Sequence, residues 1–468
     1  NFDGITYAKG ASVLQQLVAH VGRDNFITGL QKYFAKHAFA NTTLDDLLVE
    51  LTATSGRDLK PWVSTWLQTA GVNTLRPKLE ISDDEYSKIE IMQEAPLVPA
   101  GSKELRPHRL AVGLYDVKGD DVVLRKSVEL DVAGSSTTVT ELAGEKVADL
   151  LLINDRDLSY AKVRLDERSI ATLKSHLGNI SDGLTRAMCW AISWDMLRDA
   201  EISATDFIEI ALAGLPGESD ITVVTVIGNQ LTTAVELYAN PANRDALRIK
   251  VADGIANLLA SAKAESDHQL QYAKAFADFA YTPAQFEKIK AILNGSINGL
   301  TVDADLRWFV FICGVKRGIF NAADIETEAA KDMTAHGKQY AALAHAALPS
   351  AAAKAAAFKA ITTDNLSNTI HAYTCRGFNL AIHGELLVPF VDKYFESILE
   401  VWETKGYEIA ETTATLLFPA WVISEETVKK AEHWLEVTGK DASHAMRRTV
   451  AEGRDAMTRA LKARAADK

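Results

Sequence analysis

The sequence predicts a multidomain, mostly α-helical protein, and three changes of hydrophobic pattern along its 468 residues support this prediction. Residues 1–75 carry apolar side chains at helical spacing, residues 76–166 alternate apolar and polar side chains, and residues 167–468 return to helical spacing. These patterns predict a helical segment, then a small β-sandwich, then an α-helical solenoid of the HEAT or armadillo kind.

Residues 1–75 are predicted to fold as several helices with clear ends. Leu14, Leu17 and Val21 follow helical spacing, and Gly22 comes directly after them as a stop. Thr42 and Thr43 precede Asp45 and Asp46, a pattern that resembles a capping box and predicts a helix start. This much helix without an obvious core of its own indicates the end of a larger domain.

Residues 76–166 are predicted to form about seven short strands. Val128, Leu130 and Val132 alternate with polar residues, and Gly119-Asp120 lies between two such runs, which predicts a hairpin. The run Leu150–Ile153 is apolar without interruption, and this pattern predicts a central strand.

The helical pattern from residue 167 onward is rich in alanine and broken at intervals. Its breaks fall at Ser203, Gly214–Gly217, Asn240, Thr282, Gly295, Asp303, Pro349, Gly384, Gly406 and Ser424. The alanine-rich run Ala351–Ala357 is expected to form helix. Stacked helical hairpins present a concave surface that can hold a long or flexible ligand.

Composition restricts the classes of partner. The chain has 62 acidic and 50 basic side chains and a formal net charge of −12, which repels phosphate backbones and predicts no nucleic-acid partner. No apolar run reaches the roughly 20 residues that a membrane span requires, so no membrane partner is expected. Cys189, Cys313 and Cys375 lie inside apolar helical patterns and are predicted to be buried free thiols of a cytoplasmic protein.

Tyr7 is the first candidate for chemistry. It shares one helical face with Ala11, Leu14 and Val18, so the spacing predicts that Tyr7 begins a buried stripe. A tyrosine in that position is usually a core residue whose hydroxyl finds a carbonyl acceptor.

Tyr7-Ala8-Lys9-Gly10 also resembles the segment that carries the catalytic tyrosine in the aminopeptidase N family of zinc metallopeptidases (the gluzincin clan). Further segments resemble this family in the same order along almost the whole chain; they are Asn41–Leu47, Trp62–Gly71, Leu151–Asp155, Arg186–Trp190, Asp305–Trp308 and Pro389–Phe395. Each segment is a weak signal alone, and their ordered series is a strong one.

The resemblance implies an architecture and a cofactor. It implies that residues 1–75 are the C-terminal helical part of a thermolysin-like catalytic domain, that 76–166 are a β-sandwich domain, and that 167–468 are the helical C-terminal domain. In this family the two His of an H-E-x-x-H helix and a later Glu hold zinc. The closest pair of His here, His336 and His345, is nine residues apart, so the zinc-binding motif is missing and no metal ligand is assigned. The chain is expected to begin just after that helix.

The resemblance assigns one catalytic residue, Tyr7, as a hydrogen-bond donor to the oxyanion that forms during peptide hydrolysis. In the helical region, Arg307 and Arg376 lie within apolar helical patterns beside Trp308 and Phe378. A guanidinium there could receive the C-terminal carboxylate of a peptide, although such an arginine is more often part of an internal ion pair.

The sequence therefore predicts the C-terminal portion of a zinc-dependent aminopeptidase that acts on peptides, requires zinc as the full-length enzyme, and is inactive as this fragment with no cofactor of its own. The alternative is a non-catalytic scaffold that binds a peptide or a protein. A relative with another hydrolase activity, or one that has lost catalysis, also stays open, and the oligomeric state cannot be read from the sequence.

Overall fold

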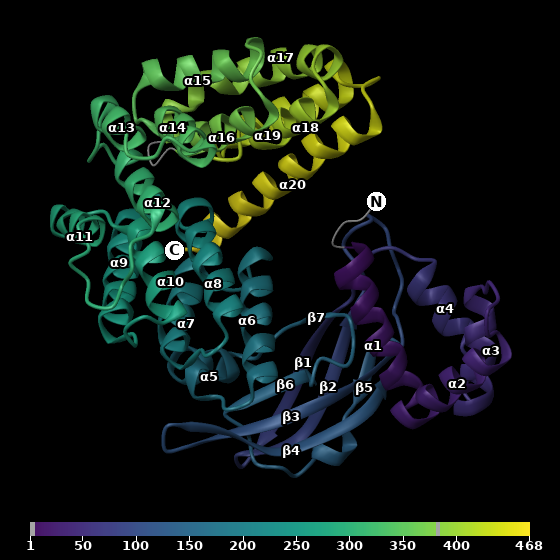
Figure 1. The fold of residues 1–468 in the computed structure, drawn as a ribbon. Coiled ribbons are helices and arrows are strands. Elements are labelled where there is room, and N and C mark those ends of the chain that lie inside the picture. Colours follow the sequence, from purple (N-terminus) through teal and green to yellow (C-terminus); the bar gives the residue numbers. More distant parts are fainter. Residues whose placement is uncertain (1–4, 381–383) are drawn as a thin grey trace. The chain divides into compact units, whose positions relative to one another are not determined.

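The computed structural model describes residues 5–380 and 384–468, which are mostly helical and contain two small sheets (Figure 1). The chain packs as two compact units. The first runs to Met196 and includes Ala213–Gly217, and the second comprises Leu197–Leu212 and Glu218–Lys468. The domain boundaries predicted near residues 75 and 166 both fall inside the first unit, and they stay predictions.

The first unit begins with short helices. They are the π-helix η1 (Ile5–Lys9) and the α-helices α1 (Gly10–Val21), α2 (Arg23–Lys36), α3 (Leu44–Ser55) and α4 (Lys60–Leu67). The predicted start of α3 is confirmed, because the backbone N–H of Thr43 donates to the Asp46 carboxylate at 2.8 Å. Gly56 ends this helix with a φ of 69°, a conformation that glycine adopts without strain.

Seven strands follow and form two sheets. They are β1 (Thr74–Ser82), β2 (Glu85–Glu94), β3 (His108–Lys118), β4 (Asp121–Val132), β5 (Ser136–Thr138), β6 (Leu150–Asp155) and β7 (Lys162–Val163), with the short helix η2 (Thr140–Leu142) after β5. The sheet orders are β5-β2-β1-β7 and β4-β3-β6. The predicted hairpin is confirmed, because Gly119 and Asp120 separate the antiparallel strands β3 and β4.

The prediction that Leu150–Ile153 is a central strand is wrong, because β6 lies at the edge of its sheet and β3 is central. All six residues of β6 are buried nevertheless. The helix that follows covers this strand, and the Ser169 hydroxyl accepts the backbone N–H of Leu151 at 2.9 Å. An edge strand that a helix covers has the same apolar pattern as a central one.

The remaining elements of the first unit are helical. They are α5 (Glu167–His176), η3 (Leu177–Asn179), α6 (Gly183–Arg198, which ends in the second unit), α7 (Ala204–Gly214, which begins in the second unit) and η4 (Leu215–Gly217).

The second unit contains helices in the part that the structure describes. They are α8 (Ile221–Thr233), η5 (Ala234–Tyr238), α9 (Arg244–Ser261), α10 (Asp267–Phe279), α11 (Pro283–Leu293), α12 (Ala304–Val315), α13 (Ala322–Ala329), α14 (Ala335–Ala347), α15 (Ala351–Thr363), α16 (Asn368–Asn379), η6 (Gly384–Leu386), η7 (Val388–Phe390), α17 (Val391–Thr404), α18 (Tyr407–Leu416), α19 (Glu425–His433), η8 (Trp434–Thr438) and α20 (His444–Ala466). Predicted breaks at Thr282, Asp303 and Ser424 are N-cap residues whose side chains accept backbone N–H groups.

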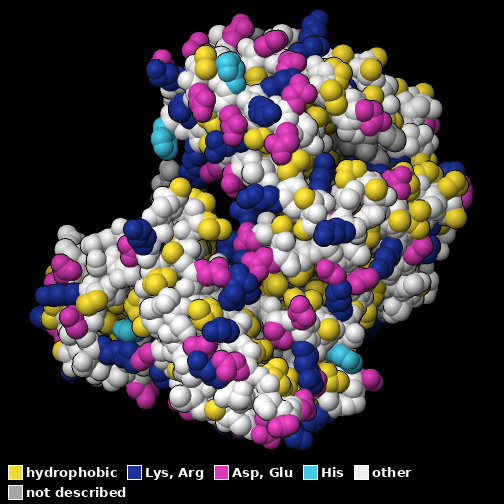
Figure 2. Space-filling view, turned by 180° about the vertical axis from the view of Figure 1, so that it is seen from behind, with side chains coloured by type: hydrophobic (Ala, Val, Ile, Leu, Met, Phe, Trp, Pro, Cys, Tyr) yellow, Lys and Arg dark blue, Asp and Glu magenta, His cyan; other side chains and the backbone are white. Residues whose placement is uncertain are grey.

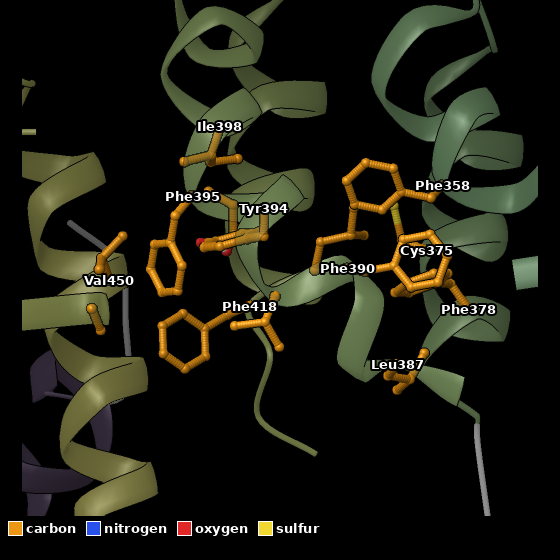
Figure 3. Packing of buried hydrophobic residues seen from close by; sticks show 14 of the residues in the cluster. Phe358, Cys375, Phe378, Leu387, Phe390, Tyr394, Phe395, Ile398, Phe418 and Val450 are labelled. Atoms are coloured by element: carbon orange, nitrogen blue, oxygen red, sulfur yellow. The ribbon is translucent and has the colours of Figure 1, made fainter. Parts of the chain in front are cut away.

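Aromatic side chains fill the core of the C-terminal helices (Figure 3). The rings of Phe378 and Phe390 meet edge to face with centroids 5.2 Å apart, and Phe358 lies 5.1 Å from Phe390. This packing joins α15 and α16 to the segment before α17, so the helices share one core rather than standing alone.

The surface carries both signs of charge. Figure 2 shows Lys and Arg side chains interspersed with Asp and Glu side chains on the face that it presents. Among the described helices, none is both long enough and apolar enough to cross a bilayer.

Candidate functional site

Tyr7 lies in the π-helix η1, directly before α1. A π-helix is rare and often occurs at functional positions. Tyr7 is 65% exposed.

The prediction that Tyr7, Ala11, Leu14 and Val18 form a buried stripe is wrong. Tyr7, Ala11 and Leu14 are exposed, and Leu14 keeps 54% of its surface. The buried face of α1 instead carries Val13, Gln16, Leu17 and Val21. Val13, Leu17 and Val21 are also at helical spacing, so α1 has two apolar faces in its sequence, and spacing alone does not show which one is buried.

Gln16 anchors α1 to the segment that follows β6. Its side-chain carbonyl accepts the backbone N–H of Tyr160 at 2.9 Å and the hydroxyl of Ser159 at 3.2 Å. The ammonium of Lys9 lies 5.9 Å from the centroid of the Tyr160 ring. The strand region therefore positions the helix that carries Tyr7, through partners more than 140 residues away in sequence.

His108 and Arg106 are two further buried residues that make hydrogen bonds in this region. The His108 ring contacts the Ser159 hydroxyl at 2.7 Å and the Gln93 side-chain carbonyl at 3.1 Å, and burial lowers the pKa of His108 to about 3. Arg106 donates to Asn73 at 2.8 Å and to the Thr69 hydroxyl at 2.7 Å, just past the end of α4. A neutral imidazole and a fully engaged guanidinium indicate a structural role.

Arg307 pairs with a buried carboxylate. Its Nη2 donates to Glu328 at 2.7 Å, its Nε donates to the other carboxylate oxygen, and its Nη1 donates to the carbonyl of Leu293 at 3.1 Å. The hydrogen bonds that Arg307 donates to the Glu328 carboxylate raise the pKa of Arg307. Most of its hydrogen-bonding capacity is thus used inside the protein.

Arg376 is exposed on α16, with its guanidinium carbon 5.4 Å from the centroid of the Tyr373 ring. Tyr373 meets Tyr340 at 5.6 Å, and Tyr340 stacks on Trp308 at 5.9 Å. The rings of Trp308 on α12, Tyr340 on α14 and Tyr373 on α16 therefore form a row. One end of the row lies next to Arg307 in the sequence, and the other end contacts Arg376. The sequence analysis missed Tyr340 and Tyr373, because each lies alone in its helix and only the packing brings them together.

No group of three or more His, Cys, Asp or Glu side chains that could hold a metal ion occurs within residues 5–380 and 384–468. The three cysteines are buried and free, as predicted. Burial raises the pKa of Cys189 and of Cys375 to about 12, so neither thiol is a nucleophile at neutral pH.

Two protein-family models match the chain. Residues 150–459 match the family model for the ERAP1-like C-terminal domain, and residues 1–66 match that for the Peptidase family M1 domain.

Individual relatives agree with these family matches. The chain is 46% identical over 475 aligned positions to Aminopeptidase N of Streptomyces lividans, which covers 100% of this chain and 55% of that protein. It is 27% identical over 218 positions to the mitochondrial Aminopeptidase 2 of Saccharomyces cerevisiae, covering 42% of this chain and 22% of the yeast protein. It is 24% identical over 237 positions to the Tricorn protease-interacting factor F2 of Thermoplasma volcanium, covering 50% and 27%.

The chain thus spans about half the length of the Streptomyces relative, and its alignments cover 22% and 27% of the lengths of the other two proteins. The ordered motifs, the helical C-terminal region and the full-length alignment agree on one assignment. The chain belongs to the peptidase M1 family and carries an ERAP1-like C-terminal domain.

Proposed function

We propose that the protein to which this chain belongs is a zinc-dependent aminopeptidase that removes N-terminal residues from peptides, and that this chain is its C-terminal portion. The observation that carries the proposal is 46% identity to Aminopeptidase N of Streptomyces lividans along the entire chain. M1 family aminopeptidases are zinc-dependent in general. The described residues offer no donor set for zinc, so under this proposal the ligands come from outside this chain and the chain alone is inactive.

Under this proposal Tyr7 stabilises the transition state. Bound zinc would supply a Lewis acid and an activated water. The Tyr7 hydroxyl donates a hydrogen bond to the scissile carbonyl oxygen as negative charge develops on it, an interaction that contributes about 3 to 4 kcal/mol at comparable sites. Its exposed position on η1 supports this role, because a donor to substrate must not be buried in the protein.

The rest of the chain provides support and substrate binding. We assign η1 to α4 to the end of a thermolysin-like catalytic domain, the strands to a β-sandwich, and the later helices to a HEAT- or armadillo-like domain. Arg376 is the better of the two predicted arginines to receive a peptide carboxylate, because it is exposed whereas Arg307 is paired with Glu328. The three buried free thiols support a cytoplasmic location.

A peptide-cleavage assay on the native gene product separates this function from that of a binding scaffold. Mass spectrometry should show loss of single residues from the free N-terminus of an unstructured peptide and no cleavage of the same peptide after N-terminal acetylation. Peptide that is bound but uncleaved would reject the peptidase function and favour the scaffold.

Tyr7→Phe in the native gene product tests the catalytic role of the hydroxyl. We expect kcat to fall by about 100- to 1000-fold while KM stays nearly constant, because the hydrogen bond forms mainly in the transition state. Tyr33→Phe is the matched control, since that hydroxyl contacts Thr42 on the same unit and has no role in the proposal. Unchanged turnover in Tyr7→Phe would remove the assignment.

A further inference from the structure

A cavity of about 740 Å³ lies beside β3, β4 and the start of α6, all within the first unit. Its size falls in the range of small-molecule sites. Polar side chains from four elements line it, namely Tyr115 on β3, Ser127 on β4, Asp155 on β6 and Thr185 on α6. Leu124 and Leu184 form part of its apolar wall. The proposed peptidase chemistry makes no use of this cavity.

Asp155 is the central polar group of the cavity and is only 1% exposed. One carboxylate oxygen accepts the Tyr115 hydroxyl at 2.8 Å, and the other accepts the Ser127 hydroxyl at 3.2 Å. No Lys, Arg or His forms an ion pair with Asp155 in the described part of the chain. A carboxylate offers about four acceptor positions, and these two hydrogen bonds occupy two of them. A buried carboxylate with only neutral partners favours a cationic ligand.

The local fold holds this carboxylate in place. Asn154 fixes the turn after β6, since its side chain accepts the backbone N–H of Ser159 at 2.9 Å and donates to the carbonyl of Ser159 at 2.8 Å. Gly113 on the adjacent strand leaves the space that the carboxylate occupies, because a Cβ atom there would lie 2.9 Å from Asp155 Oδ2. The carboxylate therefore has a defined position, between the Tyr115 and Ser127 hydroxyls and against Gly113.

The charges around the cavity leave its interior negative. Asp182 also lines it, and the backbone hydrogen bond from Thr185 lowers the pKa of Asp182, so this group is ionised at neutral pH. Arg156 is a cationic group in the lining, but its Nη2 lies 2.6 Å from the Glu129 carboxylate. Two carboxylates thus line the cavity. The Arg156 guanidinium is paired with Glu129, and the nearby Arg186 guanidinium, which also lowers the pKa of Asp182, is not part of the lining.

We propose that this cavity binds an alkylammonium ion, with the ammonium hydrogen-bonded to Asp155 and the hydrocarbon chain along Leu124 and Leu184. An ammonium supplies three donors, which can be shared between the Asp155 carboxylate and a neighbouring hydroxyl. An organic cation fits better than a metal ion, because the described residues contain no cluster of metal-ligating side chains and the walls are partly apolar. The ammonium can belong to a free diamine or to a lysine side chain of a polypeptide.

Calorimetric titration of the chain with pentylamine, and with pentan-1-ol as the neutral molecule of similar length, tests the proposal. We expect pentylamine to bind at least about tenfold more tightly than the alcohol, and Asp155→Asn to remove that preference. Asp116→Asn is the control, because Asp116 lies on β3, pairs with Arg125 at 2.9 Å and does not line the cavity. Equal binding of the two probes, or unchanged binding of pentylamine by Asp155→Asn, overturns the proposal.

Leu184→Trp is a second variant, which tests the cavity as the binding site if the Asp155→Asn protein does not fold. Leu184 is 45% exposed, so a larger side chain there obstructs the cavity without disturbing the core. We expect it to weaken pentylamine binding at least about tenfold, and an unchanged affinity contradicts the site. Titration with 1,5-diaminopentane and with Nα-acetyl-lysine methylamide then separates the two sources. Tighter binding of the diamine supports a free amine as the ligand, and tighter binding of the lysine derivative supports a polypeptide.

Discussion

The ammonium of Lys354 lies in the interior of the helical unit and connects two helix ends. Lys354 is fully buried on α15, and its Nζ donates to the carbonyls of Ala346 at 2.7 Å, Phe378 at 2.8 Å and Gly377 at 3.1 Å. These carbonyls belong to the last turns of α14 and α16, where helix dipoles favour a cation. Burial opposes the charge and prevails, lowering the pKa of Lys354 to about 7.

Lys354 should make stability depend on pH. The unfolded lysine keeps its proton up to about pH 10.5 whereas the folded one releases it from about pH 7, so raising the pH across this range favours the folded state. The free energy of unfolding of the wild type minus that of Lys354→Met should rise by up to about 1.4 kcal/mol for each unit of increasing pH. Chemical denaturation at pH 7 and pH 9 measures it. A difference that does not change with pH would show that Lys354 keeps its ordinary pKa.

Sequence patterns do not predict the contacts of these individual residues. The run Ala351–Ala357 was expected to form helix, and it does so within α15. Nothing in that run distinguishes Lys354 from a solvent-exposed lysine, because its three acceptors come from other helices. The same holds for Gln16 and for Asp155, whose partners are far apart in sequence.

At the scale of elements, close packing of α14 against α16 depends on a glycine. A Cβ atom on Gly377 would lie 2.1 Å from the backbone carbonyl of Leu343 and 2.9 Å from Cβ of Ala346. A backbone atom cannot move aside as a side chain can, so any larger residue forces the two helices apart.

We expect Gly377→Ala to lower the free energy of unfolding by about 1 to 3 kcal/mol through this overpacking. Gly228→Ala is the matched control, because Gly228 lies within α8 and a Cβ atom there meets nothing within 4 Å. That change should raise stability by about 0.5 to 1 kcal/mol through helix propensity. Thermal unfolding of both variants should therefore shift in opposite directions, and a stabilising Gly377→Ala would contradict the close approach.

Element types and ends were predictable where the cause is local. The hairpin at Gly119-Asp120, the cap at Thr43 and the helix starts at Thr282 and Asp303 depend on neighbouring residues only. The wrong predictions concern the position of β6 in its sheet and the buried face of α1. The edge position of β6 and the inward face of α1 depend on which distant element covers them, and a period of apolar residues does not carry that information.

At the scale of the whole molecule, the family assignment came from the order of weak motifs rather than from any site. The segments from Tyr7 to Phe395 that resemble the aminopeptidase N family extend through both units of the chain. The alignment of the whole chain with 55% of Aminopeptidase N of Streptomyces lividans agrees with that order. The candidate residue Tyr7 was predictable only through this resemblance, since its exposed position contradicts the prediction from helical spacing.

The zinc content of the native gene product tests the central claim most directly. Atomic emission measurement on the purified protein should find about one zinc ion per polypeptide, and a chelator should remove the metal and peptide hydrolysis together, with both restored by added zinc. Hydrolysis that survives complete removal of the metal, or a native product that binds no zinc, would contradict the account.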